Sequence, residues 1–212
     1  MRFSVERPYL IGIAGASCSG KTELARHLAA RLDAPVLSID SYYRELNHLS
    51  VEERALTNFD EPAAIDEPLF ISHMEALARG EEVLCPNYDF ATHSRTCEVT
   101  RIPAAPFVIV EGLFALYWPE VRALLGTRVY VDTRDEVCFA RRLARDTRER
   151  GRTEESVRRQ YAATVRPMAE LHVWPTRRHA DIIVSGESPL AQTSAAVLAH
   201  AQRAFRFAVK SW

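Results

Sequence analysis

The 212-residue sequence lacks the features that would place a chain in a membrane, in a secretory route or on a polyanion. No apolar run reaches about 18 residues, the length that spans a bilayer as a helix. Residues 1–16 have neither the cationic start and long apolar stretch of a secretory signal nor a cleavage site. Lys and Arg number 27 against 28 Asp and Glu, so no net field attracts a polyanion. We expect a cytoplasmic protein that binds neither nucleic acid nor membrane.

Cysteine is scarce, and the four that occur, Cys18, Cys85, Cys97 and Cys138, lie far apart. They form no CxxC pair, and no histidine stands near them at metal-ligand spacing, so we interpret them as reduced thiols. The sequence also lacks internal repeats and Gly/Ser linkers, while 47% of its residues are hydrophobic. A chain of this length and composition can bury one sizeable core. These observations predict a single domain over residues 1–212.

Short apolar runs rich in branched residues are typical of buried strands, and they recur along the chain. Five such runs occupy residues 9–13, 36–39, 107–110, 129–131 and 182–184. Stretches with helical spacing alternate with them, at residues 22–32, 68–78, 113–124, 134–148, 154–165 and 189–207. This alternation predicts an α/β fold, with a parallel sheet of about five strands flanked by helices on both faces.

Residues 81–103 interrupt the alternation. Residues 82–86 and 95–100 are two extended stretches that flank a polar, aromatic turn. The pattern predicts a β-hairpin inserted into the α/β body. Tyr88, Phe90 and His93 in the turn suit stacking on, and hydrogen bonding to, a planar base, although a lone histidine is more often structural.

One motif indicates nucleotide chemistry directly. It follows the first apolar run, opens a predicted helix and fits GxxxxGK(S/T) with Gly15, Ala16, Ser17, Cys18, Ser19, Gly20, Lys21 and Thr22. Glycines let backbone N–H groups converge on phosphate oxygens, and the following helix directs its positive dipole end at them. Lys21 would reach the β- and γ-phosphates and Thr22 would bind Mg²⁺, so the motif predicts a P-loop NTPase fold. The alternative is a glycine-rich turn without a ligand.

Two carboxylates end predicted strands at the edge of the sheet that also presents the P-loop. Glu111 ends the run at residues 107–110 and is a candidate Mg²⁺ ligand; alternatively it caps the next helix. Asp40 ends the run at residues 36–39 and could accept the proton of an incoming hydroxyl; the alternative is an aspartate that caps a turn.

Arginines recur with helical spacing near the middle of the chain, at Arg141, Arg145, Arg148 and Arg152. One helical face could carry all four guanidinium groups toward a common anion, as a lid over a transferring phosphoryl group. Alternatively, the face is solvated and its charge is balanced by Asp146 and Glu149. Spacing alone does not decide between the two.

From about Tyr9 to Gly186 the chain resembles the uridine kinase family, P-loop kinases related to phosphoribulokinase. The resemblance rests on motifs in a fixed order: residues 12–22, Asp-Ser-Tyr-Tyr at 40–43, Asn-Phe-Asp-Glu-Pro at 58–62, Tyr-Asp-Phe at 88–90 with His93 and Arg95, Val-Glu-Gly at 110–112, Val-Asp-Thr at 131–133, the arginine-rich residues 141–152 and Ala-Asp-Ile-Ile-Val at 180–184.

The resemblance implies ATP- and Mg²⁺-dependent phosphorylation of the 5′-hydroxyl of uridine or cytidine. It implies Asp40 as the base, Asp60 as the acceptor of a ribose hydroxyl, and Tyr88 and His93 at the pyrimidine. Further implied substrate or lid contacts are Tyr43, Arg142, Arg152 and Gln160. The candidate catalytic residues are then Asp40, Lys21, Arg142 and Arg145. Residues 138–165 would form the lid, and the family suggests a homotetramer.

The chain departs from the family pattern at Asn87, Trp174 and His179, and again after Val184. There Ser185-Gly186-Glu187-Ser188 lacks a basic group at the adenine end, so GTP stays beside ATP as a candidate donor. A kinase of the same fold with another hydroxyl acceptor, such as a sugar phosphate or a pantothenate-like molecule, is the alternative function. A regulatory ATPase is a further one, whereas a GTPase is disfavoured because we find no NKxD motif.

Overall fold

The computed structural model describes residues 8–46, 48–50, 53–54, 57–90 and 92–210, without the side chains of residues 206–210. Two parts of the sequence predictions fall outside the described residues. They are residues 1–7, within the segment in which we expect no secretory signal, and Ala91 in the predicted hairpin turn. Among the helices of the described part, none is long and apolar enough to cross a membrane.

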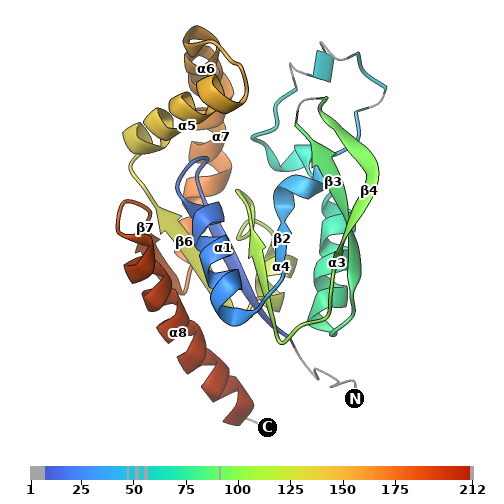
Figure 1. The fold of residues 1–212 in the computed structure, drawn as a ribbon, viewed down its shortest axis with the longest axis vertical. Coiled ribbons are helices and arrows are strands. Elements are labelled where there is room, and N and C mark those ends of the chain that lie inside the picture. The colour runs from blue at the N-terminus through green and yellow to red at the C-terminus, as the bar shows by residue number, and fades with distance from the viewer. Residues whose placement is uncertain (1–7, 47, 51–52, 55–56, 91, 211–212) are drawn as a thin grey trace.

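A parallel five-stranded sheet forms the centre of the fold (Figure 1). Its strands lie in the order β2-β5-β1-β6-β7 and span Val36–Ser38 (β2), Phe107–Glu111 (β5), Tyr9–Gly15 (β1), Thr127–Asp132 (β6) and Ile182–Ser185 (β7). Each pair of neighbours is parallel, so the carboxyl ends of all five strands share one edge. The predicted sheet is confirmed.

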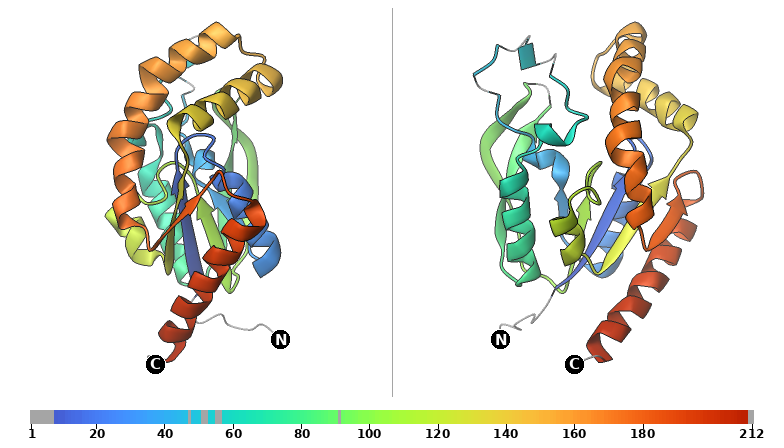
Figure 2. Two further views of the ribbon diagram at one scale, coloured as in Figure 1. Left: turned by 90° about the vertical axis from the view of Figure 1, so that its left-hand side faces the viewer. Right: turned by 180° about the vertical axis from the view of Figure 1, so that it is seen from behind.

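Helices cover both faces of this sheet (Figure 2). The helices α1 (Lys21–Leu32) and α8 (Leu190–Lys210) pack together on one face. The other face carries α3 (Glu67–Ala78), α4 (Pro119–Leu124) and the helical segment 154–179, which follows α5 (Asp135–Glu149). This arrangement confirms the prediction of a sheet enclosed on two sides.

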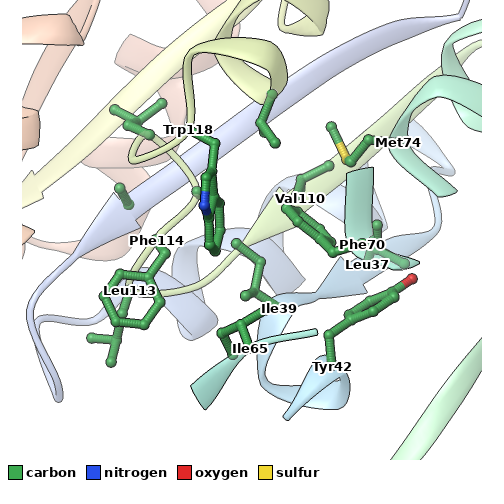
Figure 3. Packing of buried hydrophobic residues seen from close by; sticks show 14 of the residues in the cluster. Leu37, Ile39, Tyr42, Ile65, Phe70, Met74, Val110, Leu113, Phe114 and Trp118 are labelled. Carbon is green, nitrogen blue, oxygen red and sulfur yellow. The ribbon is translucent and has the colours of Figure 1, made fainter. Parts of the chain in front are cut away.

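The fully buried strand β1 shows why the chain needs two cores. Leu10 and Ala14 belong to the core on the α3 face, whereas Ile11 and Ile13 belong to the core on the α1 face. Alternate side chains of a strand point to opposite faces, so an uninterrupted apolar strand has to be covered on both. Figure 3 shows the larger core, where Phe70 of α3 packs at the sheet with its ring centroid 5.8 Å from that of Trp118.

The inserted hairpin is confirmed as a separate antiparallel sheet made of β3 (Val83–Asp89) and β4 (Ser94–Ile102). Its base is anchored because Val83 and Ile102 are buried in the core beside α3. A register shift between Pro86 and Tyr88 follows from the missing N–H of proline, which cannot donate to the ladder. From its anchored base the hairpin extends upward, so that its free end lies above the carboxyl edge of the main sheet (Figure 1).

The predicted helix over residues 113–124 is wrong in its first half. Only Pro119–Leu124 is helical, and the preceding Leu113, Phe114 and Leu116 are buried in turns against the core. A proline at the first helical position disfavours helical geometry in the residue before it, so the helix cannot extend back through Trp118. The apolar spacing of these residues reflected the burial of their side chains in the core and not a helical conformation.

The helix predicted over residues 154–165 continues further than the pattern indicated. The α-helix α6 (Glu154–Gln160) passes into π-helical turns at Tyr161–Val165 and Ala169–Val173, around the short helix α7 (Arg166–Met168), and ends in a 3₁₀ helix, Trp174–His179. Pro167 lies between the π-helical turns and cannot donate a backbone hydrogen bond. Wider turns keep the helical path continuous past such a residue.

Candidate active site

The P-loop joins β1 to α1 at the carboxyl edge of the sheet. Gly20 precedes α1 with a φ of 100°, a conformation that glycine adopts without strain. The amide of Leu24 donates to the Gly20 carbonyl at 3.1 Å, which leaves the earlier amides of α1 without an intrahelical acceptor. Ser19 Oγ is buried and has no hydrogen-bond partner within the described chain. Such a cradle of unpaired donors fits an anion.

Lys21, the lysine of the motif, is only 8% exposed and folds back over this loop. Its ammonium donates to the Ala16 carbonyl at 3.3 Å. Arg141 of α5 approaches from the other side, where it donates to the carbonyls of Cys18 and Ser19 at 3.5 Å and to that of Gly186 at 3.0 Å. The loop is thus enclosed by two cations.

Thr22 and Glu111 meet at the start of α1, as the sequence analysis expected for a metal site. Thr22 Oγ1 donates to Glu111 Oε2 at 3.1 Å, and Ser38 Oγ donates to Glu111 Oε1 at 2.8 Å. Glu111 is 4% exposed, so the two hydroxyls satisfy a buried carboxylate. A hydroxyl beside a carboxylate is the oxygen donor set that Mg²⁺ prefers, so these residues fit the ion.

A pocket of about 1110 Å³ extends from the P-loop across the carboxyl edge of the sheet. Its walls come from the P-loop, from the hairpin β3–β4 and from the arginine-rich end of α5, which lie around that edge in Figure 1. Pockets for one small ligand measure about 300–1,000 Å³. The volume lies just above this range, so the pocket is large enough for a ligand of nucleotide size.

Asp40 lies in this pocket within a 3₁₀ helix, Ile39–Tyr42, that directly follows β2. Burial, and then the nearby charge of Glu111, raise the pKa of Asp40 to about 6, against the opposing charges of Lys21 and Arg150. A carboxyl with a pKa close to neutrality can take up a proton and release it again, which suits a general base.

Five ring side chains form a cage on the hairpin side of the pocket: Tyr43, Phe59, Tyr88, Phe90 and His93. The His93 and Phe59 rings are stacked, with centroids 4.8 Å apart and an interplanar angle of 12°. Tyr88 lies 5.2 Å from Tyr43 and 5.3 Å from Phe90, centroid to centroid. Flat apolar faces in this arrangement can enclose a planar ring.

Two polar atoms of the cage, Tyr88 Oη and His93 Nδ1, are buried and have no hydrogen-bond partner in the described part of the chain. Burial raises the pKa of Tyr88 to about 12, so its hydroxyl stays protonated. Burial, and then Arg152 and Arg150, lower the pKa of His93 and keep its ring neutral at pH 7. A neutral imidazole has one donor and one acceptor nitrogen, so the cage can hydrogen bond to the edge of a base.

Asp60 faces the same pocket. Burial raises its pKa, while Arg142 and Lys21 favour the ionised form. An aspartate this close to the cage and to Asp40 suits the acceptance of a hydrogen bond from a hydroxyl group of a ligand. The structure thus brings together the substrate-side candidates that come from Asp40–Tyr43, Asp60 and the hairpin.

Arg95 fastens the hairpin to the segment that follows Asp40. Its guanidinium donates to the carbonyls of Tyr43 at 3.0 Å and Tyr42 at 3.3 Å, and it pairs with Asp66 at 3.1 Å. From the sequence, Arg95 was one residue of a family motif with no predicted role. Its contacts fix the aromatic cage relative to Asp40.

The candidate lid residues Arg142, Arg152 and Gln160 also come together. Arg142 donates to Ser17 Oγ of the P-loop at 2.9 Å and to Gln160 Oε1 at 3.1 Å. Arg152 donates to the same amide oxygen. Arg145 lies beside them and binds Asp146. These side chains link α5 and α6 to the P-loop over the pocket.

The prediction that one helical face carries four arginines toward an anion is wrong. The helix α5 ends at Glu149, so Arg152 lies beyond it, and the 76% exposed side chain of Arg148 pairs with Glu149. The alternative of a solvated face fails too, because Asp146 is completely buried. The arginines that converge on Asp146 are instead Arg142, Arg145, Arg150 and Arg152.

Sequence reasoning missed four residues of the site: Ser38, Phe59, Asp146 and Arg150. Ser38 stands two positions before Asp40 and Phe59 lies within the motif at 58–62, but only the fold shows that they contact Glu111 and His93. Arg150 lies 5.4 Å over the Phe90 ring, a contact between segments that are far apart in the sequence. A charged residue on the core-facing side of an amphipathic helix was the available signal for Asp146.

Comparison with known proteins places these features in a family. A model of the phosphoribulokinase/uridine kinase family matches residues 10–191. The chain is 44% identical over 189 residues to a uridine kinase from Chloroflexus aurantiacus, covering 87% of this chain and 90% of that one. It is 42% identical over 183 residues to a uridine kinase from Clostridium perfringens, covering 85% and 88%.

A solved structure shares the fold at low sequence identity. The phosphoribulokinase from Rhodobacter spheroides superposes with a TM-score of 0.64 at 14% identity, over 88% of this chain and 75% of that one. The match extends the likeness in sequence to the arrangement of the sheet and helices. The family model covers most of the chain and the named relatives align over more than four-fifths of it, so the chain belongs to the phosphoribulokinase/uridine kinase family.

Proposed function

We propose that this chain is a nucleoside kinase that transfers the γ-phosphoryl group of ATP to the 5′-hydroxyl of uridine or cytidine. Membership of the family and the P-loop support a kinase with ATP as the donor. The relatives named uridine kinase, at 42% and 44% identity, support the acceptor. GTP is the alternative donor, and the reaction with uridine is therefore also measured with GTP in place of ATP.

The aromatic cage beside Asp40 and Asp60 is the observation that carries the choice of acceptor. This side of the pocket offers stacked rings and the unpaired polar atoms of Tyr88 and His93, which favour an acceptor with a planar ring over a sugar phosphate, which has none. Stacking and one or two hydrogen bonds are what a pyrimidine ring requires. Asp60 then lies where a ribose hydroxyl could donate to it.

Asp40 acts as the general base in this proposal. Its carboxylate accepts the proton of the 5′-hydroxyl as the oxygen attacks phosphorus, which contributes a factor of about 10² to 10⁴ in rate. The raised pKa of Asp40 makes it a stronger base than an ordinary aspartate. Positioning and charge neutralisation supply the remainder, as in phosphoryl transfer generally.

Cations on the donor side neutralise the charge of the phosphates. Lys21 and the amides at the start of α1 hold the donor, and Arg142 reaches the same place through Ser17 of the P-loop. Thr22 and Glu111 would hold Mg²⁺, whose charge neutralises phosphate oxygens when it is bound. Arg145, Arg152 and Gln160 would order the lid over the reacting groups.

The remaining parts of the proposal rest on the resemblance to the family. We assign a single kinase domain to residues 1–212, with residues 81–103 as the nucleoside-binding hairpin and residues 138–165 as the lid. We place the reaction in pyrimidine salvage in the cytoplasm and the assembly as a homotetramer, without nucleic acid or membrane partners. Gel filtration with light-scattering detection checks the assembly. A measured molar mass that differs from the mass of four chains contradicts the homotetramer.

A coupled assay of ADP release tests the function. Purified protein is mixed with ATP and Mg²⁺ and then with uridine, cytidine, adenosine, ribulose 5-phosphate, pantothenate or no acceptor. The uridine reaction is repeated with GTP as the donor, and the release of GDP is measured. The proposal predicts turnover with uridine or cytidine and none with the others. Turnover with ribulose 5-phosphate alone would establish the sugar-phosphate alternative, and equal ADP release without acceptor would establish an ATPase.

A further inference from the structure

Four arginine side chains surround one carboxylate that has no exposed surface. Asp146 of α5 is 0% exposed, whereas the side chains of Arg145, Arg150 and Arg152 keep between 27% and 35% of their surface exposed. Arg142, the fourth, is 7% exposed and also contacts the P-loop through Ser17. The carboxylate is therefore hidden behind guanidinium groups that face the pocket.

The two oxygens of Asp146 divide the arginines between them. Oδ1 accepts from Arg145 Nε at 2.9 Å and lies 3.7 Å from Arg150 Nε. Oδ2 lies 3.5 Å from Arg142 Nε and 3.7 Å from a terminal nitrogen of Arg152. The three longer pairs attract without forming short hydrogen bonds. Most N–H donors of these arginines thus stay available for an anion or a hydroxyl.

The backbone of Asp146 takes part in the same arrangement. Its carbonyl accepts from the amides of Arg150 at 3.2 Å and Arg152 at 3.1 Å. Between them Gly151 has a φ of 62°, which turns the chain back over the end of α5. This turn returns Arg152 to the carboxylate, whereas Arg142 and Arg150 each lie four residues from Asp146 and reach it as helical neighbours.

The cluster needs an internal anion for an electrostatic reason. Guanidinium groups that converge in a partly buried site repel one another, and burial followed by the nearby charge of Arg145 lowers the pKa of Arg150. One buried carboxylate offsets part of this repulsion and leaves a net positive charge toward the pocket. Burying the Asp146 carboxylate without a cationic partner would destabilise the fold. The carboxylate is therefore tolerated in this position only because the arginines surround it.

Through its arginines, Asp146 reaches three walls of the pocket. Arg142 binds Ser17 of the P-loop, Arg152 binds Gln160 of α6, and Arg150 lies over the Phe90 ring of the hairpin. We propose that Asp146 is a positioning residue for phosphoryl transfer: it orders the arginine cluster over the junction of donor and acceptor without touching either substrate. This inference rests on the proposed function.

The test compares Asp146→Asn with Glu136→Gln. Both changes remove one negative charge from α5, but Glu136 is exposed in the first turn of the helix, at the end far from the cluster. The variants are assayed for kcat and KM with uridine, and for the dissociation constant of ATP by calorimetry without acceptor. Asp146→Asn is expected to lower kcat about a hundredfold, the cost of small misplacements in a reacting complex. Glu136→Gln is expected to keep the wild-type kcat.

The split between binding and turnover separates positioning from simple stability. In Asp146→Asn the P-loop, Lys21 and every guanidinium charge remain, so the dissociation constant of ATP is expected not to rise. Asp146→Glu restores the charge and is expected to recover part of the lost kcat. A wild-type kcat in Asp146→Asn, or ATP binding weakened in proportion to the loss of kcat, would overturn the inference.

A second pair of variants decides the matter even where Asp146→Asn does not fold. Gly151→Val puts a β-branched residue at a positive φ and displaces the turn, whereas Gly151→Asn suits this conformation. The valine variant is expected to lose kcat while the asparagine variant retains it, and equal activities contradict the inference. Turnover of uridine by the wild type is measured alongside, since its absence sinks the proposed function rather than the role of Asp146.

Discussion

The donor side and the acceptor side of the pocket are built in opposite ways. The donor side is built on one contiguous stretch, residues 15–22 between β1 and α1, to which Glu111 and Arg142 are added. The acceptor side combines Asp40 from the end of β2, Asp60 from a loop, the rings of the hairpin and arginines from the end of α5. A contiguous site needs only its local backbone, whereas an assembled site needs every connecting contact to hold.

This difference gives the two sides different weak points. On the donor side, the first turn of a helix supplies the binding groups, so they form whenever α1 forms. On the acceptor side, Arg95 holds the hairpin to the segment after Asp40, and Asp146 holds the arginines together. Changes at these connecting residues are expected to affect acceptor use and turnover while ATP binding persists.

Removing the carboxylate of Asp40 separates the two sides most strongly. Asp40→Asn is expected to lower kcat with uridine by about 10³, within the range of a general base, because the amide cannot accept the proton. The dissociation constant of ATP, measured by calorimetry, is expected to stay close to the wild-type value. Wild-type turnover in this variant would remove Asp40 as the base.

Loosening the hairpin tests the connection between the aromatic cage and Asp40. Arg95→Lys keeps the charge but cannot reach two carbonyls and Asp66 together, so kcat/KM for uridine is expected to fall about thirtyfold, the equivalent of about 2 kcal/mol of charged hydrogen bonding. Arg101→Lys is the matched control, since Arg101 lies on the same strand but is exposed and pairs with Glu82. Equal losses in the two variants would show that the contacts of Arg95 have no special role.

The pH dependence of turnover examines the acceptor side alone. The pKa of Asp40 is raised to about 6, and only the ionised carboxylate accepts a proton. The kcat/KM for uridine is therefore expected to fall about tenfold per pH unit below this value and to level off above it. Calorimetry of ATP over the same pH range reports the donor side. A flat kcat/KM between pH 5 and about 7 would contradict the assignment.

The smallest expected effect concerns stability. Because the folded state raises the pKa of Asp40 above its usual value of 3.8, ionised Asp40 destabilises the fold. This cost is absent below about pH 4, grows as the pH rises and is complete above about pH 6. Asp40→Asn removes it, so thermal melting above pH 6 is expected to rise by about 2–4 °C per kcal/mol gained. No gain at pH 7.5 over pH 4 would argue against the burial of this charge.

The sequence predicted the two sides unequally well, for physical reasons. The five strands and the P-loop follow from local apolar runs and from a motif whose geometry is nearly self-contained. Asp40 and Glu111 followed because the carboxyl ends of parallel strands meet at one edge. The Ser38 partner of Glu111 did not follow, because no local pattern shows that β2 pairs directly with β5 and sets the Ser38 hydroxyl beside Glu111.

The arginine cluster shows where spacing fails. A helical repeat places Arg141, Arg145, Arg148 and Arg152 in a row only if the helix continues, and Gly151 ends it. The positive φ at Gly151 instead turns Arg152 back toward Asp146, where it joins Arg142, Arg145 and Arg150. Burial of Asp146 depends on four partners that converge after folding, so a window of sequence cannot show it.

Analysis of the product tests the central claim most directly. Wild-type protein is incubated with uridine, ATP and Mg²⁺, and the products are identified by mass spectrometry and by phosphorus NMR. The account predicts uridine monophosphate with phosphate on the 5′-oxygen, in an amount equal to the ADP formed. ADP without a phosphorylated nucleoside, or phosphate on another hydroxyl, would contradict it.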